Sequence, residues 1–227
     1  FWNKGANFYE QNRNKLGVTL DLSKPEGLAI LRELVSVADI FSENFTPRVI
    51  KNFGLEYEDL KKIKPDIIMV SSTGYGFYGP WANYGATGPA TEGAAGLAYQ
   101  TGYAGSDSPM MSEIPYTDYT SGEHTVFGVM AALMHRLRTG EGKFVDISQT
   151  QATSATIPEI LMDYSANKRS GPRMGNQDTA MSPHGCYPCQ GDDRWITLAV
   201  ATDNEWQALC RVLGQDGWAA DARFEDS

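Results

Sequence analysis

The sequence is short of positive charge and of long apolar runs, and each shortage excludes a class of protein. A net charge of -9 excludes the basic surface that nucleic acids or anionic membranes require. No apolar stretch approaches the roughly 20 residues that span a bilayer, and the first residues do not resemble a signal peptide. We therefore expect a cytoplasmic globular protein that has neither nucleic acid nor a membrane as its partner.

Cysteine is also scarce, and the three that occur are Cys186, Cys189 and Cys210. The first two form a C-x-x-C pair, which can be a redox dithiol or half of a zinc site. Zinc needs two further ligands, and only His184 and the distant Cys210 are available. A redox motif opens a helix, whereas this pair leads through a turn into the strand-like segment 195–201. We expect two small residues in a hairpin arm and no metal site.

The first third of the chain alternates between strand and helix patterns. Apolar alternation and β-branched runs predict strands at 17–22, 39–44 and 67–72. Capping and terminating residues predict helices from about 25 to 38, where Ser23 to Glu26 fit a capping box, and at 47–53 and 57–64. This order indicates an α/β protein with an open parallel sheet.

Further elements follow a glycine-rich loop. We expect a short helix at 91–99, a long one with a capping box at Thr120 and Glu123, a strand at 143–148, and helices at 149–167 and 203–213. In the long helix one apolar face should be formed by Val126, Val129, Met130, Leu133 and Leu137. The polar segment 168–182 indicates a linker. We predict one domain over 1–172 and the start of a smaller α+β domain over 173–227.

The glycine loop itself has the spacing G-x-G-x-x-G at Gly74, Gly76 and Gly79, directly after a predicted strand. That spacing is typical of a dinucleotide-binding turn if a helix begins at the third glycine and an acid follows about 20 residues later. Here Pro80 and further glycines follow instead, and residues 99–103 contain no acid. We therefore expect no nicotinamide dinucleotide site.

Several segments together resemble the family III CoA-transferases, which include the formyl-CoA and crotonobetainyl-CoA:carnitine enzymes. The similarity is strongest in NRNKLGVTLDLSKPEG, ADIFSENFTPRVIKNFGLEYEDLKKIKPDIIMVSSTGYGFYGP, PYTDYTSGEHTVFGVMAALMHRLRTGEGKFVDIS and HGCYPCQGDDRWITLAVATDNEWQALCRVLG. The resemblance implies a Rossmann-like large domain, a second smaller domain and two subunits interlocked as rings. The family's N-terminal unit and closing segment have no counterpart here, so we expect a fragment of a longer protein.

The resemblance also implies an activity and its catalytic residue. Asp118 matches the family's catalytic aspartate, which attacks an acyl-CoA thioester and passes CoA to a carboxylic acid through an acyl-aspartyl anhydride and an aspartyl-CoA thioester (an EC 2.8.3-type reaction). The substrates would be an acyl-CoA and a small carboxylic acid, with no permanently bound cofactor. Asp118 lies just before a predicted helix, where the positive end of the helix dipole favours a carboxylate. An ordinary helix cap explains the same position.

For coenzyme A, the resemblance points to Leu20, Asn44 and Phe45 at strand ends. Relatives have a cation where this chain has Asn52, and the neighbouring Arg48 and Lys51 could replace it on a phosphate. Gly74 and Gly76 would let the backbone approach the thioester or its pantetheine arm. A glycine loop that stabilises the oxyanion in relatives has no visible counterpart.

Two other functions remain open. An α-methylacyl-CoA racemase would share the fold and ligand, but it uses a histidine after the glycine loop, and residues 85–96 contain none. A non-catalytic CoA-binding subunit is the second alternative, and the presence of Asp118 argues against it. Glu92 could assist Asp118 as an auxiliary acid, although a surface glutamate on a short helix is the simpler expectation.

Overall fold

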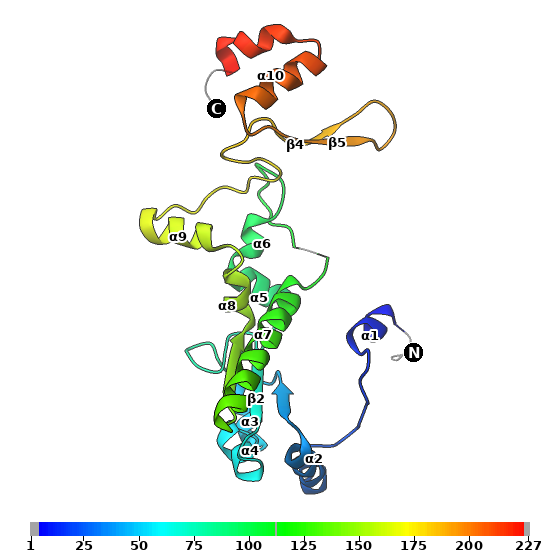
Figure 1. The fold of residues 1–227 in the computed structure, drawn as a ribbon, viewed down its shortest axis with the longest axis vertical. Helices are drawn as coiled ribbons and strands as arrows, with labels where there is room; N and C mark the ends of the chain where they lie inside the picture. Colours follow the sequence, from blue (N-terminus) through cyan, green and yellow to red (C-terminus); the bar gives the residue numbers. More distant parts are fainter. Residues whose placement is uncertain (1–4, 112, 225–227) are drawn as a thin grey trace. The chain divides into compact units, whose positions relative to one another are not determined.

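The computed structural model describes residues 5–111 and 113–224. The strands are β1 (Ile40–Glu43), β2 (Ile68–Thr73), β3 (Phe144–Ser148), β4 (His184–Pro188) and β5 (Trp195–Ala199). The helices before the glycine loop are α1 (Ala6–Gln11), α2 (Pro25–Val37), α3 (Pro47–Asn52) and α4 (Tyr57–Ile63). Those after it are α5 (Gly88–Ala95), α6 (Leu97–Gln100), α7 (Tyr116–Thr139), α8 (Gln149–Ser154), α9 (Pro158–Asn167) and α10 (Asp203–Val212) (Figure 1). Two short 3-10 helices, Asp216–Ala220 and Ala222–Phe224, follow α10.

Contacts divide the chain into two compact units. Unit 1 contains the described residues up to Thr73, with Phe77–Asn83 and Thr125–Ile147. Unit 2 contains Gly74–Gly76, Tyr84–His124 and the described residues from Ser148 onward. Helix α7 contributes its first part to unit 2 and its remainder to unit 1. The predicted domain boundary near residue 172 is a single point along the chain, whereas these two units each contain several separate segments. The boundary stays a prediction.

Unit 1 is built on a three-stranded parallel sheet in the order β1-β2-β3. The register of the first pair places Ile40 beside Ile68 and Glu43 beside Ser71. Residues Ile67 to Val70 have no exposed surface, which explains why β2 is a continuous apolar run instead of an alternating one. The expected α/β class with an open parallel sheet is confirmed.

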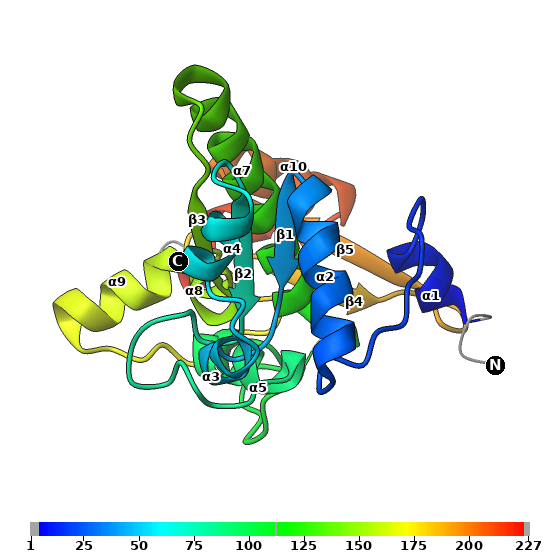
Figure 2. The ribbon, with the colours of Figure 1, turned by 90° about the horizontal axis from the view of Figure 1, so that it is seen from below.

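Helices cover both faces of this sheet. On one face Met69 and Phe41 pack with residues of α2, α3 and α4, including Val35, Ile50 and Leu60. Figure 2 shows α2 alongside β1 and α4 over β2. On the other face a second cluster forms where α7 meets the strands, made by Ile68, Val70, Ala132, Val129, Leu133, Ile40, Val145 and Ile147. This burial on both sides is the usual state of a parallel sheet.

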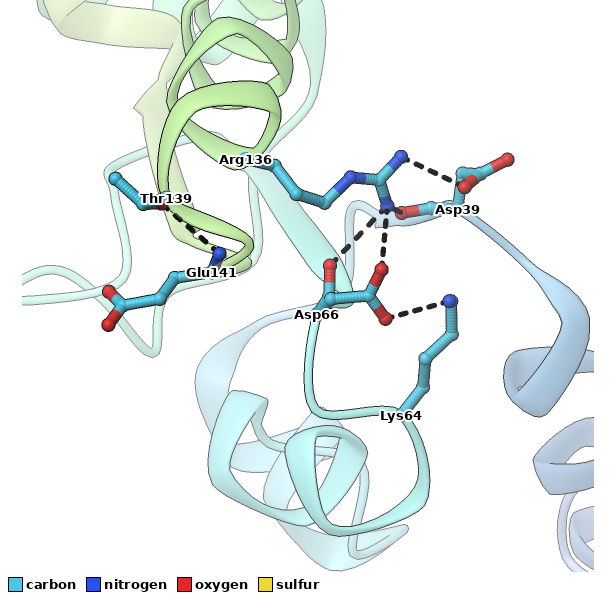
Figure 3. A network of polar contacts seen from close by, with 6 residues as sticks. All are labelled: Asp39, Lys64, Asp66, Arg136, Thr139 and Glu141. Atoms are coloured by element: carbon cyan, nitrogen blue, oxygen red, sulfur yellow. Dashed lines mark hydrogen bonds and ion pairs between the residues drawn. The ribbon is translucent and has the colours of Figure 1, made fainter.

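A polar network joins α7 to the loops that enter β1 and β2 (Figure 3). The Arg136 guanidinium lies 2.9 Å from a carboxylate oxygen of Asp39 and 3.7 Å from one of Asp66. The Lys64 ammonium contacts Asp66 at 2.7 Å, and its hydrogen bond holds the pKa of that carboxyl below its ordinary value. Because Arg136 also donates to the backbone carbonyls of Asp39 and Asp66, it ties the amino ends of both strands to one helix.

The predicted first strand, 17–22, is wrong. This segment has no strand structure, and Leu16 and Val18 are 101% and 69% exposed. A strand needs a hydrogen-bonded neighbour, and no strand of the described residues pairs with it. The capping box at Ser23 is also wrong, because Ser23 donates its backbone N–H and its hydroxyl to the Asp21 carboxylate, at 3.0 and 2.6 Å. Pro25 does occupy the first turn of α2.

The start of α7 differs from its prediction. The helix begins at Tyr116, so Thr120 lies inside it and Asp118 lies in its first turn, not ahead of it. The Thr120 hydroxyl donates to the carbonyl of Thr117 instead of capping an N–H. The predicted apolar face also divides in two. Val129 and Leu133 pack on the sheet, whereas Val126, Met130 and Leu137 are exposed.

Two predicted helices are each interrupted. The helix expected at 149–167 ends at Ser154 and resumes at Pro158, since proline cannot donate the hydrogen bond that a continuous helix would need there. The helix expected at 91–99 is interrupted at Gly96, whose φ of 89° is left-handed. In both cases one helix was predicted because the apolar pattern continues past the residue that interrupts the helix.

The last part of unit 2 is an antiparallel hairpin followed by a helix. β4 pairs with β5 in a register that places Cys186 opposite Thr197, so this cysteine lies in a hairpin arm as expected. α10 begins at a complete capping box between Thr202 and Glu205 that the sequence analysis missed. No helix of residues 5–111 and 113–224 is long and apolar enough to cross a membrane.

Candidate active site

The Asp118 carboxylate is exposed at the start of α7, within unit 2. Its Oδ1 accepts a hydrogen bond from the side-chain amide of Gln149 at 3.1 Å. On its other side lies Gly88, the first residue of α5, where a Cβ would be 3.4 Å from Oδ2 and only 2.6 Å from the Pro115 side chain. Any larger residue at 88 would therefore displace the loop that leads into α7.

Buried hydroxyl groups hold the three helices around this carboxylate. Thr117 and Thr91 share a hydrogen bond of 2.9 Å that joins α7 to α5, and neither residue has exposed surface. Thr120 and Thr153 share one of 3.0 Å that joins α7 to α8. Because these threonines flank Asp118 along the helix, the backbone that presents the carboxylate is fixed from both sides.

The glycine loop lies in contact with the same helices. The carbonyl of Gly74 accepts hydrogen bonds from the backbone N–H and the hydroxyl of Thr150, at 3.0 and 2.8 Å. Thr150 follows Gln149 in the chain, so consecutive residues of α8 contact Gly74 and Asp118. A Cβ on Gly74 would lie 2.2 Å from that of Ala86. The protein's own packing therefore explains this glycine, and its role toward coenzyme A stays a prediction.

The other predicted coenzyme A residues lie in unit 1 or, for Gly76, at the edge of unit 2. Asn44 and Phe45 are exposed directly after β1, and the Phe45 ring contacts that of Phe53 edge-on. Gly76 has a φ of 87°, which only glycine adopts without strain. Leu20 is half-buried in an extended segment that is not a strand end.

The cations predicted to bind phosphate, Arg48 and Lys51, are exposed on α3 together with Asn52. The backbone N–H of Arg48 donates to the Asn83 side chain at 3.1 Å. Neither cation forms an ion pair with another described residue. Both side chains are therefore available to an anion, and their predicted role remains a prediction.

Sequence reasoning missed Gln149 and two carboxylates, Glu43 and Asp146. Glu43 accepts the N–H of Phe45 at 2.7 Å, and Asp146 accepts that of Phe77 at 2.9 Å. A signal was present, since in both strands the acid stands two residues after a phenylalanine that packs in the core. Glu43 is buried whereas Asp146 is exposed, and a buried charge on a strand is unusual enough to indicate a role.

Of the two expectations for Glu92, a surface glutamate or an auxiliary acid, the first is wrong. Glu92 is 1% exposed in α5, so it is not a surface glutamate. A role beside Asp118 stays a prediction. No three His, Cys, Asp or Glu side chains of residues 5–111 and 113–224 are grouped as metal ligands.

One cavity, of about 600 Å³, lies between the hairpin and α10 in unit 2. Aromatic and aliphatic side chains line it, among them Tyr187, Trp206, Trp218 and Phe224. None of the predicted site residues lines this cavity, so it is separate from the candidate active site.

Comparison with known proteins places this geometry in a family. The model of CoA-transferase family III matches residues 2–227. The chain is 33% identical to the succinate–glutarate CoA-transferase of Agrobacterium fabrum, over 96% of this chain and 54% of that protein. It is also 33% identical to the acetyl-CoA:oxalate CoA-transferase of Acetobacter aceti, over 95% of this chain and 55% of that protein.

A solved structure agrees with these matches. A CAIB/BAIF family protein from Brucella suis superposes with a TM-score of 0.82 and 31% identity, covering 94% of this chain and 56% of that one. The chain thus spans about half the length of the curated relatives it matches. The matched family model covers nearly every residue, and the chain belongs to CoA-transferase family III.

Proposed function

We propose that the full-length protein transfers CoA from an acyl-CoA to a carboxylic acid, with Asp118 as the covalent nucleophile. The observation that supports this most directly is the exposed Asp118 carboxylate, held by Gln149 in a chain of this family. The helix-cap alternative is weaker, because Asp118 lies inside the first turn and accepts its hydrogen bond from a side chain. Relatives are named as CoA-transferases for succinate and glutarate, for acetyl-CoA and oxalate, and for succinyl-CoA and L-malate, which suggests small acids as substrates.

The proposed reaction proceeds through anhydride and thioester intermediates on Asp118. An oxygen of the Asp118 carboxylate attacks the thioester carbonyl, the carbon–sulfur bond breaks, and CoA leaves as a thiolate. The thiolate then attacks the aspartyl carbonyl of the anhydride and releases the donor acid, which leaves an aspartyl-CoA thioester. The acceptor carboxylate attacks the aspartyl carbonyl of this thioester, the carbon–sulfur bond breaks, and CoA leaves as a thiolate from a second anhydride, now with the acceptor acid. The thiolate then attacks the acceptor acyl carbon of that anhydride, which releases the Asp118 carboxylate and yields the new acyl-CoA.

Local electrostatics support a reactive carboxylate at this position. Asp118 lies in the first turn of α7 and against the first residue of α5, where the partial positive charge of helix amino ends favours an anion. The Gln149 amide orients one oxygen, and the second one, beside Gly88, accepts no hydrogen bond from the residues that the structure describes and can attack. Each attack on a carbonyl forms a tetrahedral oxyanion that needs stabilisation, and backbone N–H groups supply this in related chemistry.

The racemase alternative lacks support. It needs a histidine as a proton carrier near Asp118. His124 is the histidine nearest in sequence, and its Nδ1 lies 2.8 Å from the Thr120 carbonyl within α7. A ring held against the helix backbone is poorly placed to abstract a substrate proton.

Substitution of Asp118 tests the proposal in the full-length protein. Asp118→Asn and Asp118→Ala should each abolish CoA transfer while thermal unfolding changes little, because the carboxylate is exposed and its loss leaves no cavity. Mass spectrometry after incubation with succinyl-, glutaryl-, acetyl- and oxalyl-CoA should find an adduct on Asp118 that hydroxylamine removes. Glu123→Gln, an exposed acid further along α7, is the matched control and should keep full activity.

Full transfer by freshly prepared Asp118→Asn, with reversion to aspartate excluded by mass, would contradict the proposal. Tight CoA binding by a wild-type protein that transfers nothing would indicate a non-catalytic subunit instead.

A further inference from the structure

The loops that follow β1 and β2 are each held by a carboxylate that faces a backbone N–H. After β1, Glu43 Oε2 accepts the N–H of Phe45 at 2.7 Å, across the turn that contains Asn44. After β2, Asp146 Oδ1 on β3 accepts the N–H of Phe77 at 2.9 Å, one residue beyond Gly76. Both contacts lie in unit 1 and at the carboxyl end of the sheet, where open α/β sheets bind their ligands.

The two carboxylates are partly withdrawn from water. Glu43 is 8% exposed, and burial raises its pKa, with a smaller contribution in the same direction from Asp146. Asp146 is exposed as a whole residue, yet partial desolvation of its carboxyl raises its pKa as well. The Ser71 hydroxyl beside Glu43 and the Phe45 N–H act in the opposite direction. Two acids close together in partly desolvated surroundings are unfavourable unless strong hydrogen bonds to their carboxylates compensate.

Among the described residues, the N–H of Phe45 is the hydrogen-bond partner that holds the Glu43 side chain. Within the described residues, Glu43 Oε1 and the hydroxyls of Ser71 and Thr73 are buried without a hydrogen-bond partner of normal geometry. Ser71 is the register partner of Glu43 on β2. Removal of the carboxylate would therefore remove the acceptor that holds the Phe45 N–H.

We propose that Glu43 and Asp146 are positioning residues for acyl-CoA, which fix the Asn44–Phe45 and Gly76–Phe77 loops in their binding conformations. This inference rests on the proposed function, because those loops contain residues that the family resemblance assigns to coenzyme A. Neither carboxylate touches the reacting atoms. Their loss should therefore weaken acyl-CoA binding and leave the chemical step unchanged.

The test uses the full-length protein with Glu43→Ala, Glu43→Gln, Asp146→Ala and Asp146→Asn. Each alanine variant should raise the KM for acyl-CoA, and its Kd in titration calorimetry, by about tenfold, with kcat nearly unchanged. The amide variants keep an acceptor oxygen and should stay within about threefold of wild type. Glu33→Ala, an exposed glutamate on α2, is the control and should change neither constant.

Hydrogen exchange supplies a readout that does not depend on the ligand. The amides of Phe45 and Phe77 should lose protection in the matching alanine variant and keep it in the amide variant. Asp146→Ala keeps the inference testable if Glu43→Ala fails to fold, since Asp146 is the more exposed of the two.

The two possible failures can be told apart. Wild-type binding of CoA together with unchanged Kd and exchange in the alanine variants would overturn the positioning role alone. A loss of kcat at unchanged KM would also overturn it. A wild-type protein that neither binds nor transfers CoA would overturn the proposed function, and the positioning role with it.

Discussion

The buried Glu43 carboxyl should influence stability as well as binding. Its pKa is raised in the folded state above the ordinary value of 4.5, mainly by burial. The folded protein therefore holds the proton more tightly than the unfolded chain does. The free energy of unfolding should fall as the pH rises from about 4.5 through the folded pKa, and then level off.

Glu43→Gln tests this at the scale of one residue. The comparison is direct, because glutamine cannot ionise: between about pH 4.5 and pH 8 the thermal midpoint of wild type should fall relative to that of the variant. A parallel course of the two midpoints across that range would show that Glu43 does not titrate in the folded protein.

At the scale of one element, α7 contains two glycines in different surroundings. A Cβ on Gly122 would meet nothing within 4 Å, whereas one on Gly128 would lie 2.7 Å from Val145 Cγ1 on β3. Alanine is favoured over glycine inside a helix by about 1 kcal/mol, so Gly122→Ala should stabilise the protein by about that amount. Gly128→Ala gains the same propensity but must displace Val145, which costs about 1–3 kcal/mol.

Chemical unfolding of both variants measures the difference. Gly128→Ala should be less stable than Gly122→Ala by at least about 1 kcal/mol. In a Val145→Ala background the contact disappears, and the Gly128→Ala penalty should shrink. Equal effects of the two glycine substitutions would mean that α7 does not approach β3 as closely as described.

At the scale of the whole molecule, α7 leaves an apolar stripe in solvent. Val126, Phe127, Met130, Met134 and Leu137 are 64%, 77%, 56%, 48% and 81% exposed, on the side of α7 away from the sheet. Contiguous exposed apolar surface usually marks a protein contact. The family resemblance implies a homodimer, and we expect this stripe to be covered in the assembled full-length protein.

Phe127→Glu should therefore weaken self-association of the full-length protein, because a charge buried in an apolar contact is strongly unfavourable. Light scattering would show a shift from dimer to monomer as the protein is diluted. Lys62→Glu, which introduces the same charge on the exposed surface of α4, should leave the dimer intact. A monomeric wild type, or an unaffected Phe127→Glu dimer, would contradict this expectation.

Much of unit 1 could be predicted from local patterns. The strands at 40–43, 68–73 and 144–148 and the helices between them depend on apolar periodicity, proline and glycine, which act within a few residues. The same reasoning failed at 17–22, where the alternation is present but no partner strand is available. It also placed Val126, Met130 and Leu137 on one apolar face with Val129 and Leu133, because periodicity cannot say which apolar residues meet the sheet.

The candidate site could likewise be predicted only in part from local sequence. Asp118 was found from its surrounding motif, and its residue type and position near a helix start were enough to suggest its chemistry. Its partners depended on the fold, because Gln149 is 31 residues away and Gly88 is 30 residues away on the other side. Likewise, only the pairing of β1, β2 and β3 brings Glu43 and Asp146 to the same end of the sheet. Local sequence sets which groups can react or accept a proton, and long-range packing decides which of them meet.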